Sequence, residues 1–407
     1  MKKLLNNFVC EIKLKIAKKN YEKKLSELRK VYGKRKIRVL FYVSENQKWG
    51  YQSLYEKFSE DENFEPLVVV GVITGVHKGK DKTRMNLEDN YNFFLSKGMN
   101  VEYAYKNNNY IDFREFKPDI VFYEQPWSLP KIYKPFAVSK YALTCYCPYG
   151  LSLFDFSHDY TSFHKILYKC FTDSDLNITR YEKYVKGASN NCVSIGYPKL
   201  DEYLDIKQIE LEKLWKDPEK IKIIYAPHHS FEEKGLRMAT FKENGRFILE
   251  LAKRFPQTTW VFKPHPRLKY ALLCNKIMTQ SEIENYYQEW EKIGKIYEFG
   301  SYFDIFKTSD LMITDCCSFL AEYLPSGKPL IRPIRQDSLK LNCLGKKVVE
   351  GYYETQTNPE IEKRFYQLVI EKRDEQFNSR VELKNLLIDF KEKSSDKIFQ
   401  ILHKSLI

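Results

Sequence analysis

Long hydrophobic runs are missing from this chain of 407 residues. No stretch approaches the roughly 18 uninterrupted apolar residues that a membrane-spanning helix needs. The first residues also lack an apolar segment followed by a small-residue cleavage site, which is the pattern of a secretory signal. We therefore expect a cytoplasmic protein that is neither secreted nor integral to a membrane.

Regularly spaced cysteines are absent as well. The nine cysteines form no Cys-x-x-Cys pair and the seven histidines form no His-x-x-x-His pair, so neither a zinc shell nor a disulfide framework is visible. The adjacent His228 and His229 would be poor co-ligands of one ion. Cys145, Cys147 and Cys316 lie beside apolar runs, where a reduced cysteine behaves as a small hydrophobe. The pattern predicts a reducing compartment, no metal site and no cofactor.

Beyond residue 36 the chain has almost no net basic charge. The formal net charge is +13, and the segment from Lys2 to Lys36 alone holds 13 Lys and Arg against 3 Glu, a net charge of +10. The rest of the chain is nearly balanced, whereas a nucleic-acid enzyme carries basic surface across its folded domains. We expect no nucleic-acid partner.

The opening segment combines its lysines with apolar residues at roughly helical spacing, namely Leu4, Leu5, Phe8, Ile12, Ile16, Tyr21, Leu25, Leu28 and Tyr32. This pattern predicts a basic amphipathic helix over residues 1–35. Two interpretations are open. The helix could be an arm across its own domain with a solvated charged face, or it could bind anionic lipid at the inner face of the cell membrane.

Apolar and aromatic residues are plentiful, at 43% and 15% of the chain, which is enough for two packed cores. Strand-like runs alternate with helical or loop stretches, as in a parallel sheet with crossover helices. Thr179 and Glu182 have the spacing of a capping box, which predicts that a helix begins there. In the first half, strands are expected at residues 36–44, 66–73, 101–105, 119–123, 141–147, 175–178 and 192–195.

A second alternation follows a polar stretch between about residues 205 and 219. Its expected strands are 221–225, 259–262, 311–314 and 329–331, and its expected helices are 242–255, 282–292 and 318–324. A final helix is expected from about 380 to 403. The sequence thus predicts an α/β protein with Rossmann-like domains over residues 36–205 and 206–385, and a C-terminal segment, 386–407, that returns toward the first domain.

Polar residues follow four of the expected strands. Because open parallel sheets bind ligands beyond the carboxyl ends of their strands, these positions are the candidates for a site. Two are histidine loops, at residues 225–229 and 263–267. The third is the stretch from Asp315 to Ser318, which leads into a helix, and the fourth is Pro148-Tyr149-Gly150 in the first domain.

The helix expected near Ser318 would direct its free backbone N–H groups toward an anion such as a diphosphate, with donors at Cys317 and Ser318. Glu322 lies four residues further on the same helix face, where its carboxylate could accept the hydroxyls of a ribose. The alternative is that Asp315 or Ser318 only caps the helix.

His265 stands between two prolines, which hold an extended and stiff loop. With Lys263 and Arg267 nearby, its imidazole could donate to a phosphoryl oxygen or act as a general acid or base. His228 could face the nucleotide, but a structural role for His228 and His229 is equally open.

Taken in order, four stretches resemble the motif series of the CDP-glycerol glycerophosphotransferases: IGYPKLD (195–201), YAPHHSF (225–231), FKPHPRL (262–268) and SDLMITDCCSFLAEYLPSGKPLI (309–331). The resemblance implies a GT-B fold, with two Rossmann-like domains facing across a cleft and the nucleotide held mainly by the second. It also implies transfer of a polyol phosphate from a CDP-activated donor to a hydroxyl of a glycan or lipid-linked acceptor, in teichoic-acid or capsule synthesis.

By this resemblance, His265 matches a histidine implicated in catalysis or in binding the donor phosphate, and Ser318 and Glu322 match residues that hold the donor. Lys263, Arg267, His228 and Cys317 complete the expected donor site. The family's threonine after Tyr-Ala-Pro is His228 in this chain.

Tyr149 stands where the family has the histidine of its general base. A tyrosine with the usual pKa of about 10 is a poor base at neutral pH. It could orient the acceptor while His158, Asp155 or Glu45 takes the proton. Two further functions remain open: a GT-B glycosyltransferase that uses a nucleotide sugar for capsule or lipooligosaccharide synthesis, and a binding module without activity.

Overall fold

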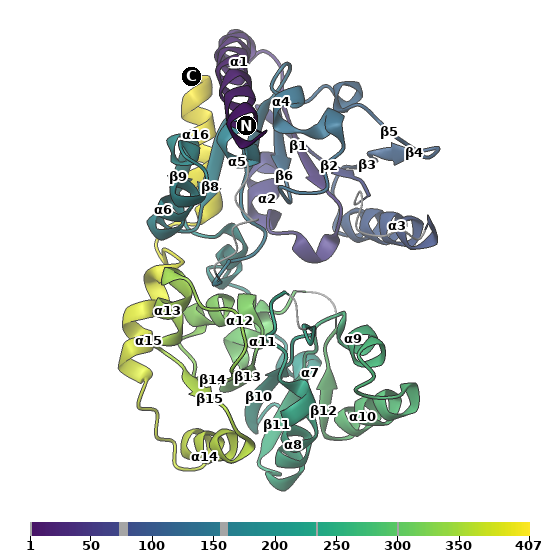
Figure 1. Cartoon of the computed structure of the whole chain (residues 1–407), viewed down its shortest axis with the longest axis vertical. Coiled ribbons are helices and arrows are strands. Elements are labelled where there is room, and N and C mark those ends of the chain that lie inside the picture. The colour runs from purple at the N-terminus through teal and green to yellow at the C-terminus, as the bar shows by residue number, and fades with distance from the viewer. Residues whose placement is uncertain (1, 73–79, 155–161, 233–234, 299–300) are drawn as a thin grey trace. The chain divides into compact units, whose positions relative to one another are not determined.

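The computed structural model describes residues 2–72, 80–154, 162–232, 235–298 and 301–407, which fold into two compact α/β units (Figure 1). Unit 1 comprises Met1–Gly150, Phe156–Asp201 and Ile388–Ile407, and unit 2 comprises Leu151–Asp155 and Glu202–Leu387. Each unit has its own parallel sheet and its own core, as the alternation of strands and helices predicted.

The described part of unit 1 is built on a parallel sheet with strand order β3-β2-β1-β6-β7-β8-β9. From β1 the chain adds β2 and β3 on one side, and it then crosses to β6 and adds β7, β8 and β9 on the other side. The order therefore reverses between β1 and β6. The strands are β1 (Ile37–Val43), β2 (Phe64–Val70), β3 (Val101–Tyr103), β6 (Ile120–Tyr123), β7 (Leu143–Tyr146), β8 (Lys169–Thr172) and β9 (Cys192–Ser194).

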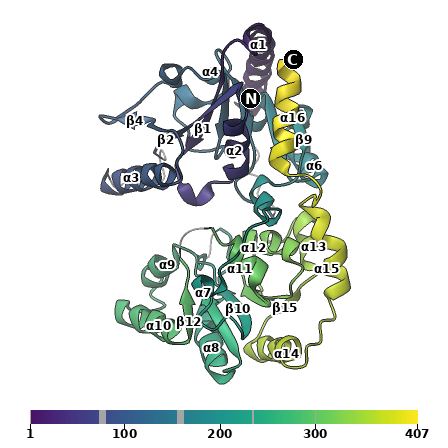
Figure 2. The same cartoon turned by 180° about the vertical axis from the view of Figure 1, so that it is seen from behind.

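Helices cover this sheet. The longest, α1 (Lys2–Val31), lies beside the C-terminal helix α16 (Ser394–Leu406), and the two stay adjacent in opposite views (Figures 1 and 2). The other α-helices in the described part of unit 1 are α2 (Gln52–Glu60), α3 (Lys80–Ser96), α4 (Pro135–Val138), α5 (Ser162–Ile166) and α6 (Asp175–Tyr184). Unit 1 also contains short 3-10 helices, among them η1 (Asn46–Lys48), and a ribbon of β4 (Tyr105–Lys106) and β5 (Asn109–Tyr110).

One face of α1 belongs to the core of unit 1. Ala17, Tyr21 and Leu28 are buried on it, four and then seven residues apart, which is one and two turns of a helix. The Tyr21 hydroxyl lies 2.5 Å from Thr144 Oγ1 and donates to the carbonyl of Ile166 at 3.0 Å. This part of α1 is thus an arm packed on its own domain.

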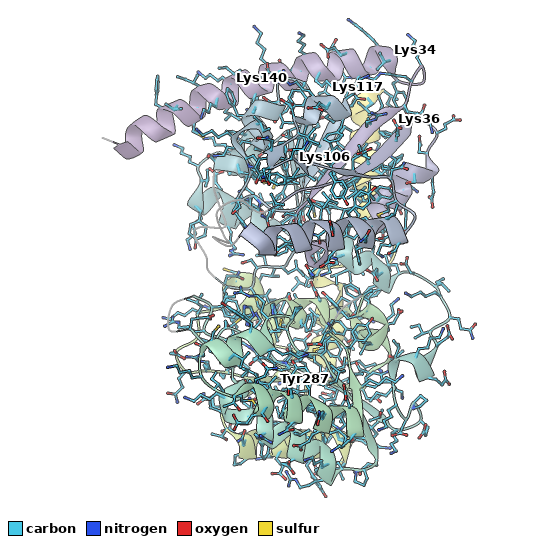
Figure 3. All side chains as sticks on the ribbon, turned by 90° about the vertical axis from the view of Figure 1, so that its right-hand side faces the viewer. Lys34, Lys36, Lys106, Lys117, Lys140 and Tyr287 are labelled. Carbon is cyan, nitrogen blue, oxygen red and sulfur yellow. The ribbon has the colours of Figure 1, made fainter. Side chains whose placement is uncertain are left out.

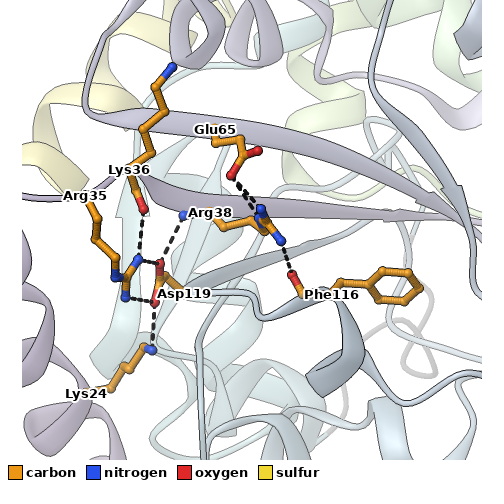
Figure 4. A network of polar contacts seen from close by, with 7 residues as sticks. All are labelled: Lys24, Arg35, Lys36, Arg38, Glu65, Phe116 and Asp119. Atoms are coloured by element: carbon orange, nitrogen blue, oxygen red, sulfur yellow. Dashed lines mark hydrogen bonds and ion pairs between the residues drawn. The ribbon is translucent and has the colours of Figure 1, made fainter.

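A buried carboxylate joins α1 to the sheet (Figure 4). Asp119, which directly precedes β6, accepts from Lys24 of α1 at 2.8 Å, from Arg35 at 2.6 and 3.0 Å, and from the backbone N–H of Arg38 at 3.0 Å. Burial raises the pKa of Asp119, but the hydrogen bonds from Arg35 and Lys24 outweigh it, so the net pKa is lowered. The carboxylate is therefore held ionised.

The described part of unit 2 repeats the plan, with strand order β12-β11-β10-β13-β14-β15 and a reversal between β10 and β13. Its strands are β10 (Ile221–Ala226), β11 (Thr258–Phe262), β12 (Gly294–Ile296), β13 (Leu311–Thr314), β14 (Leu330–Pro333) and β15 (Tyr353–Thr355). Its α-helices are α7 (Leu211–Leu214), α8 (Phe241–Arg254), α9 (Leu268–Cys274), α10 (Gln280–Ile293), α11 (Phe303–Thr308), α12 (Cys317–Glu322), α13 (Cys343–Val349), α14 (Asn358–Val369) and α15 (Phe377–Leu383).

Two expected elements were wrong. Residues 175–178 are the start of helix α6 rather than a strand, and the strand of this region is β8, six residues earlier. Asp175 opens the first turn of α6, where a negative charge favours the helix. The expected helix over 380–403 is interrupted: α15 and the short η8 (Lys384–Leu386) end before Asp389, and α16 begins at Ser394.

Candidate functional site

In unit 2, the loops after β10, β11 and β13 meet at the carboxyl edge of the sheet. The strand order reverses between β10 and β13, and open α/β sheets bind ligands at such a reversal. The loop after β10 carries His228 and His229, the loop after β11 carries His265, and Asp315 follows β13. We call His228, His229 and His265 the histidine cluster.

The rings of the histidine cluster are in contact. Their centroids lie 4.4 Å apart for His228 and His229, 3.9 Å for His229 and His265, and 5.0 Å for His228 and His265. One ring nitrogen from each lies within 4.8 Å of the other two. A backbone hydrogen bond from His265 N to the carbonyl of Pro227, 3.0 Å long, joins the two loops. The sequence predicted both loops but not that their histidines would touch.

Hydrogen bonds assign the tautomer of two rings. His228 Nδ1 accepts the backbone N–H of Ser230 at 3.2 Å and lies 2.9 Å from Ser230 Oγ, which itself accepts from Met238 N at 3.0 Å. His265 Nδ1 accepts the backbone N–H of Arg267 at 3.1 Å. A neutral imidazole that accepts at Nδ1 carries its proton on Nε2. His228 and His265 are therefore donors at Nε2.

The cluster is uncharged at neutral pH. Burial lowers the pKa of His228 well below its usual value, with His229 and His265 adding repulsion. Burial also lowers the pKa of His265 to about 3 and that of His229 to about 4, and the positive charge of Arg267 contributes to both. An anion placed beside these rings would favour their protonated forms and raise these pKa values.

Three neighbouring imidazoles can also hold a metal ion, which the sequence did not predict. A metal ligand must offer a free nitrogen lone pair. In His228 and His265 the Nδ1 lone pair accepts a backbone N–H and Nε2 carries the proton. This hydrogen bonding suits an oxyanion, which accepts N–H donors, better than a cation. His229 Nδ1 is buried and has no hydrogen-bond partner among the described residues.

Asp315 fixes the loop that carries His228. Its buried carboxylate accepts from the backbone N–H of His228 at 2.7 Å, from Thr240 N at 2.6 Å and from Thr240 Oγ1 at 2.8 Å. Burial raises the pKa of Asp315, and these hydrogen bonds act in the opposite direction. Asp315 does not cap α12, because the N-cap residue is Cys316 and makes no side-chain cap bond. The sequence missed this role of Asp315 and Thr240; the position directly after a central strand was the one available signal.

Cys317 and Ser318 begin α12, which has only six residues. Cys317 Sγ lies 3.9 Å from the carbonyl of Leu151, and Ser318 Oγ lies 3.7 Å from Cys316 Sγ. So short a helix aligns few peptide dipoles, so the anion site expected from its N-terminus has less support than the sequence suggested. The roles of Cys317 and Ser318 in binding a donor stay predictions.

Lys263 and Glu322 meet at Tyr302 rather than at the histidine cluster. Lys263 Nζ lies 5.0 Å from the ring centroid of Tyr302 and donates to the carbonyl of Tyr297 at 3.4 Å. The buried carboxylate of Glu322 accepts the Tyr302 hydroxyl. Arg267, by contrast, is exposed on the loop of His265. The donor-binding roles expected for Lys263, Arg267, His228 and Glu322 and the catalytic role of His265 remain predictions.

Tyr149, the other expected catalytic residue, lies in unit 1 after β7. Its carbonyl accepts the Tyr197 hydroxyl at 2.5 Å, and its ring lies edge-on to Trp127 with centroids 5.6 Å apart. Of the alternative bases, Glu45 forms an ion pair with Lys48. Asp155 and His158 lie outside the described residues. The role of Tyr149 stays a prediction.

Comparisons with known proteins show the fold. No family model matches the chain. No curated protein matches its sequence either. Among solved structures, the UDP-GlcNAc 2-epimerase of Neisseria meningitidis bound to UDP-GlcNAc is 14% identical, with a TM-score of 0.59 over 91% of this chain and 100% of that one. S. aureus MnaA with UDP is 14% identical, with a TM-score of 0.57 over 92% and 98%. Anabaena HepE in complex with UDP and glucose is 12% identical, with a TM-score of 0.52 over 90% and 100%.

The chain therefore has a GT-B-like α/β fold with two Rossmann-like units. The expected membership of the CDP-glycerol glycerophosphotransferases is wrong, and so is the polyol-phosphate transfer from a CDP-activated donor that it implied, because the similar structures are UDP-GlcNAc 2-epimerases and other proteins bound to UDP. The physical reason is that the motifs lie after β9, β10 and β11 and along β13 to β14. Turns at the ends of buried strands favour residues such as Pro, Gly and Ser whatever the substrate, so a series of such turns is shared more widely than one activity.

Proposed function

We propose that the chain is a GT-B glycosyltransferase that acts on a nucleoside-diphosphate sugar, and that the histidine cluster of unit 2 binds the diphosphate. One observation carries this proposal. Two imidazoles, of the buried His228 and the partly buried His265, are fixed as N–H donors where the sheet order reverses. Neutral donors in a buried setting bind anionic oxygens strongly because little water competes with them. The UDP in the similar structures supports uridine as the nucleoside.

We infer that the reaction is transfer of the sugar to an acceptor hydroxyl. An acceptor hydroxyl attacks the anomeric carbon of the donor sugar, and the bond between that carbon and the diphosphate oxygen breaks with both electrons going to oxygen. Negative charge then grows on the diphosphate. Donors at His228 and His265, with the positive charge of Arg267 nearby, stabilise that charge, and a base takes the proton of the acceptor.

Nucleotide binding tests the site. We expect UDP and UDP-sugars to raise the melting temperature and to bind in calorimetric titration, because a ligand of the folded state alone stabilises it. His265→Ala should bind UDP at least about tenfold more weakly, which corresponds to about 1.4 kcal/mol. Tyr270→Ala, an exposed residue of α9, is the matched control. Equal UDP affinity in His265→Ala and in the control contradicts the assignment.

Product analysis tests the reaction. Incubation with a UDP-sugar and candidate acceptors should release UDP in step with a glycosylated product. If the sugar instead changes configuration and stays attached to UDP, the chain is an epimerase and glycosyl transfer is wrong, while the nucleotide site stands.

We also propose that α1 holds the enzyme at an anionic membrane surface, where a glycan or lipid-linked acceptor would be found. No helix in the described part of the chain is long and apolar enough to cross a membrane. On α1, however, Phe8, Ile12 and Ile16 follow one another at one-turn spacing and are all exposed, Phe8 by 64%. Lys19 and Lys23 continue this stripe, and side chains along α1 point away from unit 1 (Figure 3).

A further inference from the structure

Both units have a reversal of strand order in their sheet, and the proposed nucleotide site uses only the reversal of unit 2. In unit 1 the strand order reverses between β1 and β6, so the residues after these strands occupy the position that His228 and Asp315 occupy in unit 2. After β1 come Ser44 and Glu45, and after β6 comes Glu124. By the rule that places ligands at such a reversal, unit 1 has a second candidate site.

Glu124 is built into unit 1 as Asp315 is built into unit 2. Its fully buried carboxylate accepts the backbone N–H of Ser44 at 3.0 Å, the Ser44 hydroxyl at 2.7 Å and the backbone N–H of Glu45 at 3.3 Å. In unit 1, Glu124 follows β6 and holds the loop after β1. In unit 2, Asp315 follows β13 and holds the loop after β10 in the same way. The loop in unit 1 is thereby fixed together with Lys48, which ends η1.

Lys48 contacts the other polar and aromatic residues of this candidate site. Its Nζ donates to Gln125 Oε1 at 2.6 Å and forms an ion pair with Glu45. It also lies 5.2 Å from the ring centroid of Tyr149 and 6.0 Å from that of Trp127. Burial lowers the pKa of Lys48, while the charge of Glu124 acts against this. Tyr149 and Trp127 are only partly buried.

The charges of this group decide the class of ligand. Among the described residues of this group, the one ammonium, of Lys48, forms an ion pair with Glu45, and Glu124, whose pKa burial raises to about 7, adds a partial negative charge. These residues therefore carry no excess positive charge that would attract a phosphate. What the group offers is two partly exposed aromatic rings beside the partly exposed ammonium of Lys48 and carboxylate of Glu45. Gln125 is buried, and its amide donates to the carbonyl of Trp127 at 3.2 Å, so it positions Lys48 and Trp127. Rings of this kind cover apolar C–H surfaces, and the polar groups bind hydroxyls, which is the combination that an uncharged sugar presents.

We propose that Lys48, Trp127 and Tyr149, held in place by Gln125 and Glu124, bind an uncharged saccharide at the carboxyl edge of the unit 1 sheet. That this saccharide is the acceptor of glycosyl transfer rests on the proposed function. The binding itself does not, because all five residues belong to unit 1 and the histidine cluster belongs to unit 2. Tyr149 would then serve as a binding surface rather than as a base.

Saturation-transfer NMR with the full chain tests the proposal. The ligands are the methyl β-glycosides of glucose, galactose and N-acetylglucosamine, with glucose 6-phosphate and inorganic phosphate as charged comparators. At least one neutral glycoside should receive saturation at its ring C–H protons. Trp127→Ala and Lys48→Ala should each weaken its binding about tenfold or more, and Tyr270→Ala in unit 2 should not change it.

Calorimetry with UDP on the same proteins separates the two proposals. UDP affinity should be equal in wild type, Trp127→Ala and Lys48→Ala. If UDP binds but no neutral glycoside does, or if glycosides bind wild type and Trp127→Ala equally, the saccharide site is wrong and the nucleotide site stands. If glycosides bind as expected and UDP does not, the nucleotide site is wrong. If Trp127→Ala fails to fold, Trp127→Phe replaces it, because phenylalanine keeps an aromatic ring. Trp127→Phe should bind the glycoside more weakly than wild type, and unchanged glycoside binding would overturn the proposal.

Discussion

At the scale of single residues, the histidine cluster shows how burial changes the chemistry of a side chain. An exposed histidine titrates near pH 6.5, but His229 and His265 have pKa values of about 4 and about 3 because burial disfavours their charged forms. They therefore act as neutral hydrogen-bonding groups at physiological pH. The same shifts make the stability of the fold depend on pH.

His265→Gln should flatten this pH dependence. In wild type, the unfolded chain binds a proton at His265 below about pH 6.5, whereas the folded chain does not until about pH 3, so stability falls as the pH falls between these values. Relative to the variant, wild type should lose up to about 2 kcal/mol between pH 7 and pH 5, at about 1.4 kcal/mol per pH unit below 6.5. Urea unfolding at pH 7, 6 and 5 measures the difference. Parallel curves for the two proteins would show that His265 keeps an ordinary pKa.

At the scale of elements, the sequence predicted strands better than helix ends. Central parallel strands such as β1, β6, β10 and β13 are buried on both faces and appear as continuous apolar runs, so they were found within one or two residues. The expected strand at the start of α6 is wrong because Leu176 and Ile178 give a short strand-like signal, although Ser174 and Asp175 directly before them favour the start of a helix.

The candidate sites were only partly visible in the sequence. Parallel topology put the histidine loops at the correct sheet edge, because residues after neighbouring parallel strands lie close together. The sequence could not show that Asp315 would bond Thr240 and His228, since these contacts join residues about 75 and 87 positions apart. Nor did it single out Glu124, whose significance comes from the reversal between β1 and β6.

Asp201 should prove important for the C-terminal helix. Its buried carboxylate accepts the backbone N–H groups of Ser394 and Ser395, each at 2.8 Å, at the start of α16. Asp201→Ala leaves two buried donors unpaired and should cost about 1–3 kcal/mol of unfolding free energy. It should also speed hydrogen exchange across residues 394–406. Asp396→Ala, which removes an ion pair with the partly exposed Lys57, is the control and should cost less than about 1 kcal/mol. An equal loss in both variants would mean that Asp201 does not cap α16.

At the scale of the whole molecule, α1 has a buried inner face and an exposed outer face. Its inner face carries Ala17, Tyr21 and Leu28 in the core of unit 1, so deleting the helix would also remove core residues. Its outer face exposes Phe8, Ile12 and Ile16 and continues into lysines. Membrane attachment must therefore be tested by changing exposed side chains only.

The triple variant Phe8→Ser, Ile12→Ser, Ile16→Ser should lose membrane binding and keep its fold. Each basic residue near an anionic surface contributes about 1 kcal/mol within a Debye length, and each apolar side chain that enters the interface adds about 1.5–3 kcal/mol. In liposome sedimentation, wild type should pellet with anionic vesicles at low salt and be released as the salt concentration rises. It should not pellet with neutral vesicles. The triple variant should stay in solution and bind UDP as wild type does. A second variant, Lys15→Gln, Lys19→Gln, Lys23→Gln, removes charge from the outer face and should lower the salt dependence. If both variants pellet with anionic vesicles as well as wild type does, α1 is only an arm of unit 1, because neither its apolar stripe nor its charge then contributes to attachment.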